Sequence, residues 1–301
     1  MRLEGLHHVT AITAEAQQNV DFYVGTLGLR MVKKTINYDQ PDVYHLYFGD
    51  ERGAPGSILT FFEFPGARAG RHGAGMIHTV SWRVASAAAL DFWAARLEHA
   101  GRPVERRTGT LLSSDPEGLG LELLSAEGRS LAATSAEIPA ELALQGLHGV
   151  RAYTQDPRRS DHLLDAMAFE ATPGGFSHRA GNAFYIYDNP PDDPGIQGAG
   201  SVHHVAWAAQ DAEHHSWRSL VQMAGARPTE IRDRTYFKSI YFREPAGVLF
   251  EIATLSPGFA VDEPADSLGD SLVLPERYES RRERIERILT PVTNPRTHTA
   301  A

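Results

Sequence analysis

The sequence predicts an α+β protein built from four βαβββ modules, and three observations support this prediction. Four segments share an opening pattern of histidine and apolar residues, and a helical pattern follows each opening. Strand-like stretches come after the helices, with a common turn in two of the modules. The first histidines of the openings, at steps of 71, 70 and 55 residues, are His7, His78, His148 and His203.

Each opening alternates apolar and polar residues, which is typical of a strand. The helical patterns that follow cover Glu15 to Thr26, Ser86 to His99, Pro157 to Ala168 and Ala212 to Met223. The second pattern ends at Gly101 with Pro103 behind it, and the fourth ends at Gly225 with Pro228 behind it. A glycine after the last turn followed by a proline is a helix stop signal, so both helices should end there.

Strands complete each module. In the first module they cover Leu29–Ile36, Val43–Phe48 and Ser57–Phe62, and in the fourth they lie near Arg227–Asp233, Ser239–Arg243 and Val248–Ala253. The second and fourth modules share a turn, Asp115-Pro116-Glu117-Gly118 and Glu244-Pro245-Ala246-Gly247. Each turn leads to a strand with a glutamate at the same offset, Glu122 and Glu251. The first module offers Thr60 at this position, and the third a residue near Tyr185.

The modules are expected at about 1–65, 74–126, 146–190 and 200–256. A linker rich in alanine and serine, about 126–145, divides them into an N-terminal pair within 1–140 and a C-terminal pair within 146–260. A tail, 261–301, follows the last module, and its segment Glu276–Leu289 has the mixed charges of a solvated helix.

Composition excludes several classes of protein. The chain has 301 residues and no cysteine, so disulfides, iron–sulfur clusters and cysteine nucleophiles are absent, and a metal must be held by histidine or carboxylate. A formal charge of −9 argues against nucleic acid as a partner. No stretch of about 18 apolar residues and no signal segment is found, so we expect a soluble cytoplasmic protein without membrane contact.

The modules and four motifs resemble the vicinal oxygen chelate superfamily of glyoxalases and extradiol dioxygenases, and within it the ring-cleaving hydroquinone 1,2-dioxygenases. The resemblance covers about residues 3–289 and implies that the modules pair into two open eight-stranded barrels. The motifs are Asn19-Val20-Asp21-Phe22-Tyr23, Leu27-Gly28-Leu29, Tyr44-His45-Leu46-Tyr47-Phe48-Gly49-Asp50 and Ser239-Ile240-Tyr241-Phe242-Arg243-Glu244-Pro245.

The repeats also point to a metal site. The residues before the valine of each opening are His8, Thr79, Gly149 and His204. Pairing the modules in sequence order places one histidine and one glutamate in each barrel, His8 with Glu122 and His204 with Glu251. Pairing the first module with the fourth, and the second with the third, instead collects His8, His204 and Glu251 in one barrel. Two histidines and one carboxylate that leave open positions are diagnostic of non-haem Fe(II) oxygenases.

The resemblance implies the same three ligands, the same crossed pairing and Fe(II), with Mn(II) as an alternative occupant. Strand alternation predicts that His7 and His203 point away from the ligands, unless a bulge brings them back. The resemblance implies that both approach the site, either as hydrogen-bond partners of the ligand side chains or as acid–base groups. The equivalent histidines, His78 and His148, occur in the barrel without the ligand set, which favours a structural role.

The resemblance places two further residues beside the substrate. Tyr241 would hydrogen-bond a substrate oxygen or donate a proton, and Arg234 would offset anionic charge. The alternatives are an ordinary core tyrosine and a surface salt bridge.

The sequence therefore predicts an Fe(II)-dependent dioxygenase that opens a hydroquinone or related aromatic diol with O₂. One alternative is a glyoxalase-like lyase or isomerase, which needs a fourth protein ligand. Glu63 is the candidate from the first module, but its offset does not match that of Glu251. A second alternative is a non-catalytic binding protein of the same fold. The sequence leaves the oligomeric state open, a homo-oligomer included.

Overall fold

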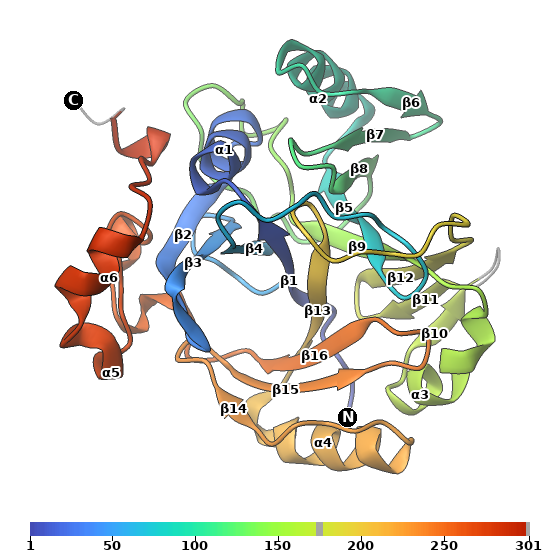
Figure 1. Cartoon of the computed structure of the whole chain (residues 1–301). Helices are drawn as coiled ribbons and strands as arrows, with labels where there is room; N and C mark the ends of the chain where they lie inside the picture. The colour runs from blue at the N-terminus through green and yellow to red at the C-terminus, as the bar shows by residue number, and fades with distance from the viewer. Residues whose placement is uncertain (173–176, 299–301) are drawn as a thin grey trace.

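The computed structural model describes residues 1–172 and 177–298, which form two eight-stranded mixed sheets (Figure 1). The first sheet runs in the order β14-β15-β16-β13-β1-β4-β3-β2. Its strands are β1 (Leu6–Thr13), β2 (Arg30–Asn37), β3 (Gln40–Gly49), β4 (Ile58–Glu63), β13 (Val202–Ala209), β14 (Arg232–Asp233), β15 (Lys238–Arg243) and β16 (Leu249–Thr254). The first module therefore shares a sheet with the fourth.

The second sheet joins the second module to the third, in the order β10-β11-β12-β9-β5-β8-β7-β6. Its strands are β5 (Ile77–Val84), β6 (Glu105–Arg107), β7 (Thr110–Ser114), β8 (Gly120–Ser125), β9 (Leu147–Tyr153), β10 (Glu170–Thr172), β11 (Ser177–Ala180) and β12 (Ala183–Asp188). The crossed pairing of modules is thus confirmed. The domain limits at 1–140, 146–260 and 261–301 stay a prediction, since each sheet draws on both halves of the sequence.

A helix follows the opening strand of every module. The helices are α1 (Ala16–Val20), which continues as a π-helix (Asp21–Thr26), α2 (Ala87–His99), α3 (Asp161–Ala166) after a 3-10 turn (Pro157–Ser160), and α4 (His214–Met223) after a 3-10 turn (Asp211–Glu213). Ser86 caps α2 by accepting a hydrogen bond from the backbone N–H of Ala89. The two predicted stop glycines, Gly101 and Gly225, have positive φ angles of 69° and 91°, as a helix C-terminus requires.

The opening strands carry β-bulges at the repeated histidines. Between Leu6 and His8 strand β1 advances two residues while β13 advances one, so His7 is the extra residue. The same count makes His203 the extra residue of β13. His78 in β5 and His148 in β9 occupy the same position in the second sheet.

The four opening strands meet at the centre of the molecule, where β1 contacts β9 and β13 contacts β5 (Figure 1). The apolar core extends from this junction to the helices on the outer faces. Its largest side chains include four tryptophans that are almost fully buried, Trp82, Trp93, Trp207 and Trp217. Trp82 and Trp207 come from the two sheets and Trp93 and Trp217 from α2 and α4, and all four belong to one apolar core.

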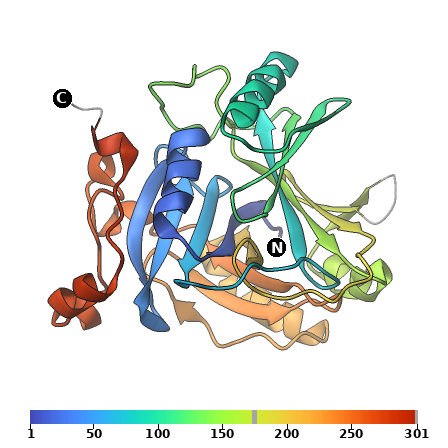
Figure 2. The same cartoon turned by 45° about the horizontal axis from the view of Figure 1, so that its top comes forward.

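The C-terminal segment lies beside β2 and β3 (Figure 2). It contains α5 (Glu276–Glu279), α6 (Arg282–Ile288) and 3-10 turns at Phe259–Val261, Ala265–Ser267 and Pro295–His298. The segment Glu276–Leu289, where a charged helix was expected, thus contains two short helices with a break between them. Arg281 leaves helical geometry at φ −113°, and the break accompanies two separate contacts: the Tyr278 hydroxyl donates to the carbonyl of Tyr38, while Ile285 is buried.

Within the described residues, the structure contains no helix that is both long enough and apolar enough to cross a membrane.

Candidate metal centre

Three side chains that are distant in sequence converge at the middle of the first sheet. Strand β13 lies between β1 and β16, so it brings His204 beside His8 and Glu251. The Nε2 atom of His204 lies 2.9 Å from Oε2 of Glu251, and Nε2 of His8 lies 3.4 Å from the same oxygen. The two Nε2 atoms are 3.2 Å apart. All three residues are buried, with at most 4% of their surface exposed.

This triangle of donor atoms fits a divalent cation. Donors about 2.1 Å from one metal and at right angles to each other lie about 3 Å apart, which agrees with the three separations. The other carboxylate oxygen of Glu251, Oε1, accepts a hydrogen bond from the Ser239 hydroxyl. Oε2 has no hydrogen-bond partner of good geometry among the described residues. It is thus a buried carboxylate oxygen that a cation would satisfy.

The charge states also suit metal binding. Burial alone would raise the pKa of Glu251, but His8 and His204 outweigh burial and hold this pKa well below its usual range. Burial lowers the pKa of His204. An ionised carboxylate beside a neutral imidazole is the form in which these side chains bind metals.

The bulges turn His7 and His203 toward the ligand histidines, so simple strand alternation fails here. Nδ1 of His7 lies 2.9 Å from Nδ1 of His8, and Nδ1 of His203 lies 2.8 Å from Nδ1 of His204. Burial lowers the pKa of His7 and of His203 to about 3, with the adjacent ligand histidine as a second cause in each case. Both are neutral near pH 7 and can accept a ligand N–H, which fixes the ring orientation.

A cavity of about 360 Å³ opens over His8 and His204, two of the three donor residues. Its apolar wall consists of side chains from the first and fourth modules, Phe62, Phe64, Phe237 and Leu249. Polar side chains that include Asn37, Asp39 and Arg232 also line it. His203 lines this cavity, whereas His7 lies behind the ligands against Phe237, with 4.8 Å between ring centres. The two histidines therefore differ in access to a bound molecule.

Tyr241 and Arg234 line the same cavity. Tyr241 pairs with Glu251 across β15 and β16, and Nε of Arg234 donates to its hydroxyl at 3.2 Å. Burial, with Glu251 as a second cause, raises the pKa of Tyr241 above its usual value, so the hydroxyl keeps its proton at neutral pH. Arg234 also forms an ion pair at 3.3 Å with the exposed Asp39. Arg234 therefore forms a salt bridge and also lines the cavity.

Sequence reasoning missed the role of His45 and Tyr47 in the wall of this cavity. Nδ1 of His45 lies 2.9 Å from the Tyr47 hydroxyl, and Nε2 lies 2.8 Å from Oγ1 of Thr60. Burial holds the pKa of His45 well below its usual value, so the ring is neutral. Alternation along β3 places both side chains on one face, and this pattern was a signal that could have found them.

The strand register identifies the fourth position around the donors. Glu251 pairs with Ala206, two residues after His204, and Thr60 pairs with Thr10, two residues after His8. Thr60 therefore occupies the place equivalent to Glu251, as expected. Its hydroxyl lies 2.9 Å from that of Thr10. Glu63 instead accepts a hydrogen bond from the backbone of Ala16, so this carboxylate serves the start of α1 rather than the donor triangle.

Comparisons with known proteins identify the family of this chain. The sequence matches the family model described as Glyoxalase/Bleomycin resistance protein/Dioxygenase superfamily over residues 5–123 and 117–252. The chain is 42% identical to the "Putative ring-cleaving dioxygenase MhqO" of Bacillus subtilis, over 95% of this chain and 96% of that protein. It is 34% identical to the chlorohydroquinone/hydroquinone 1,2-dioxygenase of Sphingobium indicum, over 96% of each chain.

Solved structures show the same architecture. A crystal structure described as a putative dioxygenase from Bacillus subtilis superposes with a TM-score of 0.92 at 40% identity, and covers 97% of this chain and 98% of that one. Glyoxalase I of Zea mays superposes with a TM-score of 0.58 at 12% identity, over 83% of this chain and 92% of that one. The maize enzyme is similar in fold alone.

Proposed function

Because this chain belongs to the glyoxalase/bleomycin resistance protein/dioxygenase superfamily, we propose that it is a ring-cleaving dioxygenase that opens a hydroquinone or related aromatic diol with O₂. The observation that carries the proposal is the triangle of His8, His204 and Glu251 beneath an aromatic-lined cavity. The names of two relatives, at 42% and 34% identity, support the same reaction class. We further propose a cytoplasmic location, with self-association left open.

Fe(II) is the proposed metal, with Mn(II) as an alternative, and it would supply open coordination positions for the diol and O₂ and pass electrons from the ring to O₂. The carboxylate of Glu251 and the imidazoles of His8 and His204 would hold it. His7 and His203 accept N–H hydrogen bonds from the ligand rings and so fix their orientation. Ser239 holds the second oxygen of Glu251, which leaves Oε2 for the metal.

The cavity residues bind and orient the diol. Phe62 and Phe237 offer apolar surface to an aromatic ring. The Tyr241 hydroxyl, protonated at neutral pH, donates a hydrogen bond or a proton to a substrate oxygen. Arg234 contacts that hydroxyl and offsets negative charge on the oxygen when the diol loses a proton.

Two observations weigh against the alternative functions. Thr60 lies at the position where a glyoxalase-like enzyme would need its fourth ligand. The carboxylate of Glu63 accepts a hydrogen bond from the backbone N–H of Ala16 instead. A purely apolar binding module has no need of a buried carboxylate with a free oxygen next to two imidazoles, because such a group is costly to bury without a cation.

The test combines metal analysis with oxygen uptake. We expect one iron or manganese per chain, and oxygen consumption with methylhydroquinone that yields a ring-opened acid. Oxygen uptake with catechol but not with methylhydroquinone would contradict the para-diol assignment. Metal binding without oxygen uptake on any diol would favour the lyase, and protein without metal that still binds diols would favour the binding module.

A further inference from the structure

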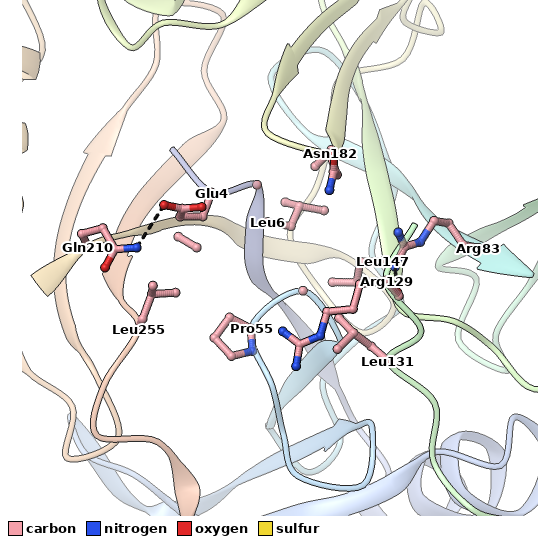
Figure 3. Close-up of a pocket in the computed structure, with 14 residues that line it drawn as sticks. Glu4, Leu6, Pro55, Arg83, Arg129, Leu131, Leu147, Asn182, Gln210 and Leu255 are labelled. Atoms are coloured by element: carbon pink, nitrogen blue, oxygen red, sulfur yellow. Dashed lines mark hydrogen bonds between the residues drawn. The ribbon is translucent and has the colours of Figure 1, made fainter. Parts of the chain in front are cut away.

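A second cavity of about 400 Å³ lies at the seam between the two sheets (Figure 3). Residues from the starts of β1, β9 and β12 and from the ends of β5 and β13 line it, and it shares no lining residue with the metal cavity. Apolar side chains, Leu6, Leu131 and Leu147 among them, form much of its wall. The cavity is thus a separate place where a small molecule could be held by both sheets.

One wall of this cavity contains a buried cation. Arg83 is only 4% exposed, and one of its terminal nitrogens, Nη2, donates to the backbone carbonyls of Arg129 at 2.7 Å and Gln145 at 2.6 Å. Its Nε has no hydrogen-bond partner, and no carboxylate pairs with Arg83 among the described residues. Burial lowers the pKa of Arg83, which is the electrostatic sign of an uncompensated charge. A buried charge of this kind is costly unless an anion pairs with it.

A second cation lines the same cavity. The exposed guanidinium of Arg129 reaches toward Pro55 in Figure 3. Glu4 lies on the other side, where the amide of Gln210 donates to its carboxylate at 3.0 Å. Two arginines and one carboxylate leave a single positive charge to be balanced, which suits a monoanion better than a phosphate dianion.

We propose that this cavity binds a small organic monocarboxylate, with the carboxylate between Arg83 and Arg129 and the apolar body against Leu6, Leu131 and Leu147. Guanidinium groups match the planar geometry of a carboxylate, and the leucines supply the apolar contact. Since the cavity is built from all four modules, its occupant would tie the two sheets together. The proposal does not depend on the reaction at the metal centre.

The experiment measures binding of benzoate and of uncharged benzamide to the metal-loaded full chain by titration calorimetry. We expect benzoate to bind and benzamide to bind at least about tenfold more weakly, because only the acid supplies the anion. Arg129→Met should weaken benzoate binding by about tenfold without unfolding the protein, since this side chain is exposed. Arg284→Met, which removes an exposed arginine of α6, is the matched control and should leave binding unchanged.

A further variant distinguishes benzoate binding in the metal cavity from benzoate binding in the cavity between the sheets. Benzoate in the metal cavity would respond to Arg234→Met, whereas benzoate at the seam would not. Loss of binding in Arg234→Met with full binding in Arg129→Met would overturn the proposal. Equal affinity of benzoate and benzamide, or no binding of either, would overturn it as well. Arg83→Met should abolish binding, and the result from Arg129→Met decides the question if that variant fails to fold.

Discussion

The two sheets share a framework and differ in what fills their centres. Every opening strand has a β-bulge whose extra residue is a histidine. These are His7 and His203 in the first sheet and His78 and His148 in the second. Each sheet also has a glutamate on the strand next to an opening strand. Glu251 pairs with Ala206, two residues after His204, and Glu122 pairs with Ser81, two residues after Thr79. The repeated histidine and the glutamate are therefore features of the fold, and neither alone makes a metal centre.

The residue that follows the bulged histidine decides whether a sheet carries metal ligands. In the second sheet Thr79 replaces a ligand histidine, and Nδ1 of His78 lies 2.9 Å from its hydroxyl, the same contact that His7 makes with His8. Arg151 forms ion pairs with Asp188 at 2.7 Å and with Glu122 at 3.6 Å. A guanidinium thus balances the charge that a metal would balance in the first sheet.

The largest expected effect comes from removing the carboxylate in each sheet. Glu251→Gln should lower metal affinity and oxygen uptake by at least about 100-fold, because an amide is a weaker ligand and adds no negative charge. Glu122→Gln, the matched variant, should keep one metal per chain and full uptake. Metal analysis and an oxygen electrode check both. Loss of metal in Glu122→Gln, or two metals in the wild type, would contradict the assignment of one centre to the first sheet.

Tyr241→Phe should reduce turnover by on the order of 100-fold while the metal stays bound, because it removes a proton donor without touching a ligand. The register places Leu112 opposite Glu122, where Tyr241 lies opposite Glu251, so the second sheet lacks this hydroxyl. Tyr153→Phe, in the second sheet, serves as the control and should turn over normally. Turnover of Tyr241→Phe at the wild-type rate would remove the tyrosine from the reaction.

His7→Gln should weaken metal binding by about 10- to 100-fold, since a flexible amide no longer holds the His8 ring in one orientation as the fixed imidazole of His7 does. His78→Gln, which disturbs the equivalent bulge of the second sheet, should leave metal affinity unchanged. A competition assay with a chelator measures both. If the two variants hold metal equally well, the bulged histidine is a structural residue in both sheets.

Repeats in the sequence predicted the four modules, the crossed pairing and the meeting of His8 with Glu251. They could do so because equivalent positions in repeated modules carry equivalent roles in strand pairing. The orientation of His7 could not be predicted, since a bulge depends on the register between strands almost 200 residues apart. Alternation places His45 and Tyr47 on one face of β3, but that this face lines the metal cavity depends on how β3 pairs with β4.

We expect that a metal centre cannot be built in the second sheet by placing histidines at the positions equivalent to His8 and His204. A Cβ atom on Gly149 would lie 2.6 Å from the backbone oxygen of Phe184, so no histidine fits there without movement of β12. Gly149→Ala should cost about 1–3 kcal/mol in the free energy of unfolding. Gly25→Ala, which meets nothing within 4 Å, should cost nothing, as urea unfolding would show. A stable Thr79→His/Gly149→His variant with two metals would contradict this view.

The smallest effect concerns His148, whose Nδ1 lacks a hydrogen-bond partner among the described residues because glycine follows it. Burial, with Arg83 and Arg179 nearby, lowers the pKa of His148 to about 4. The unfolded chain, with a histidine pKa of about 6.5, therefore takes up a proton first as pH falls, and stability declines between about pH 6.5 and 4. His148→Gln should reduce the stability lost between pH 7.5 and 5.5 by about 1 kcal/mol. Urea unfolding at both pH values measures this difference, with His162→Gln on exposed α3 surface as the control. An unchanged pH dependence would mean that His148 is solvated in the native protein.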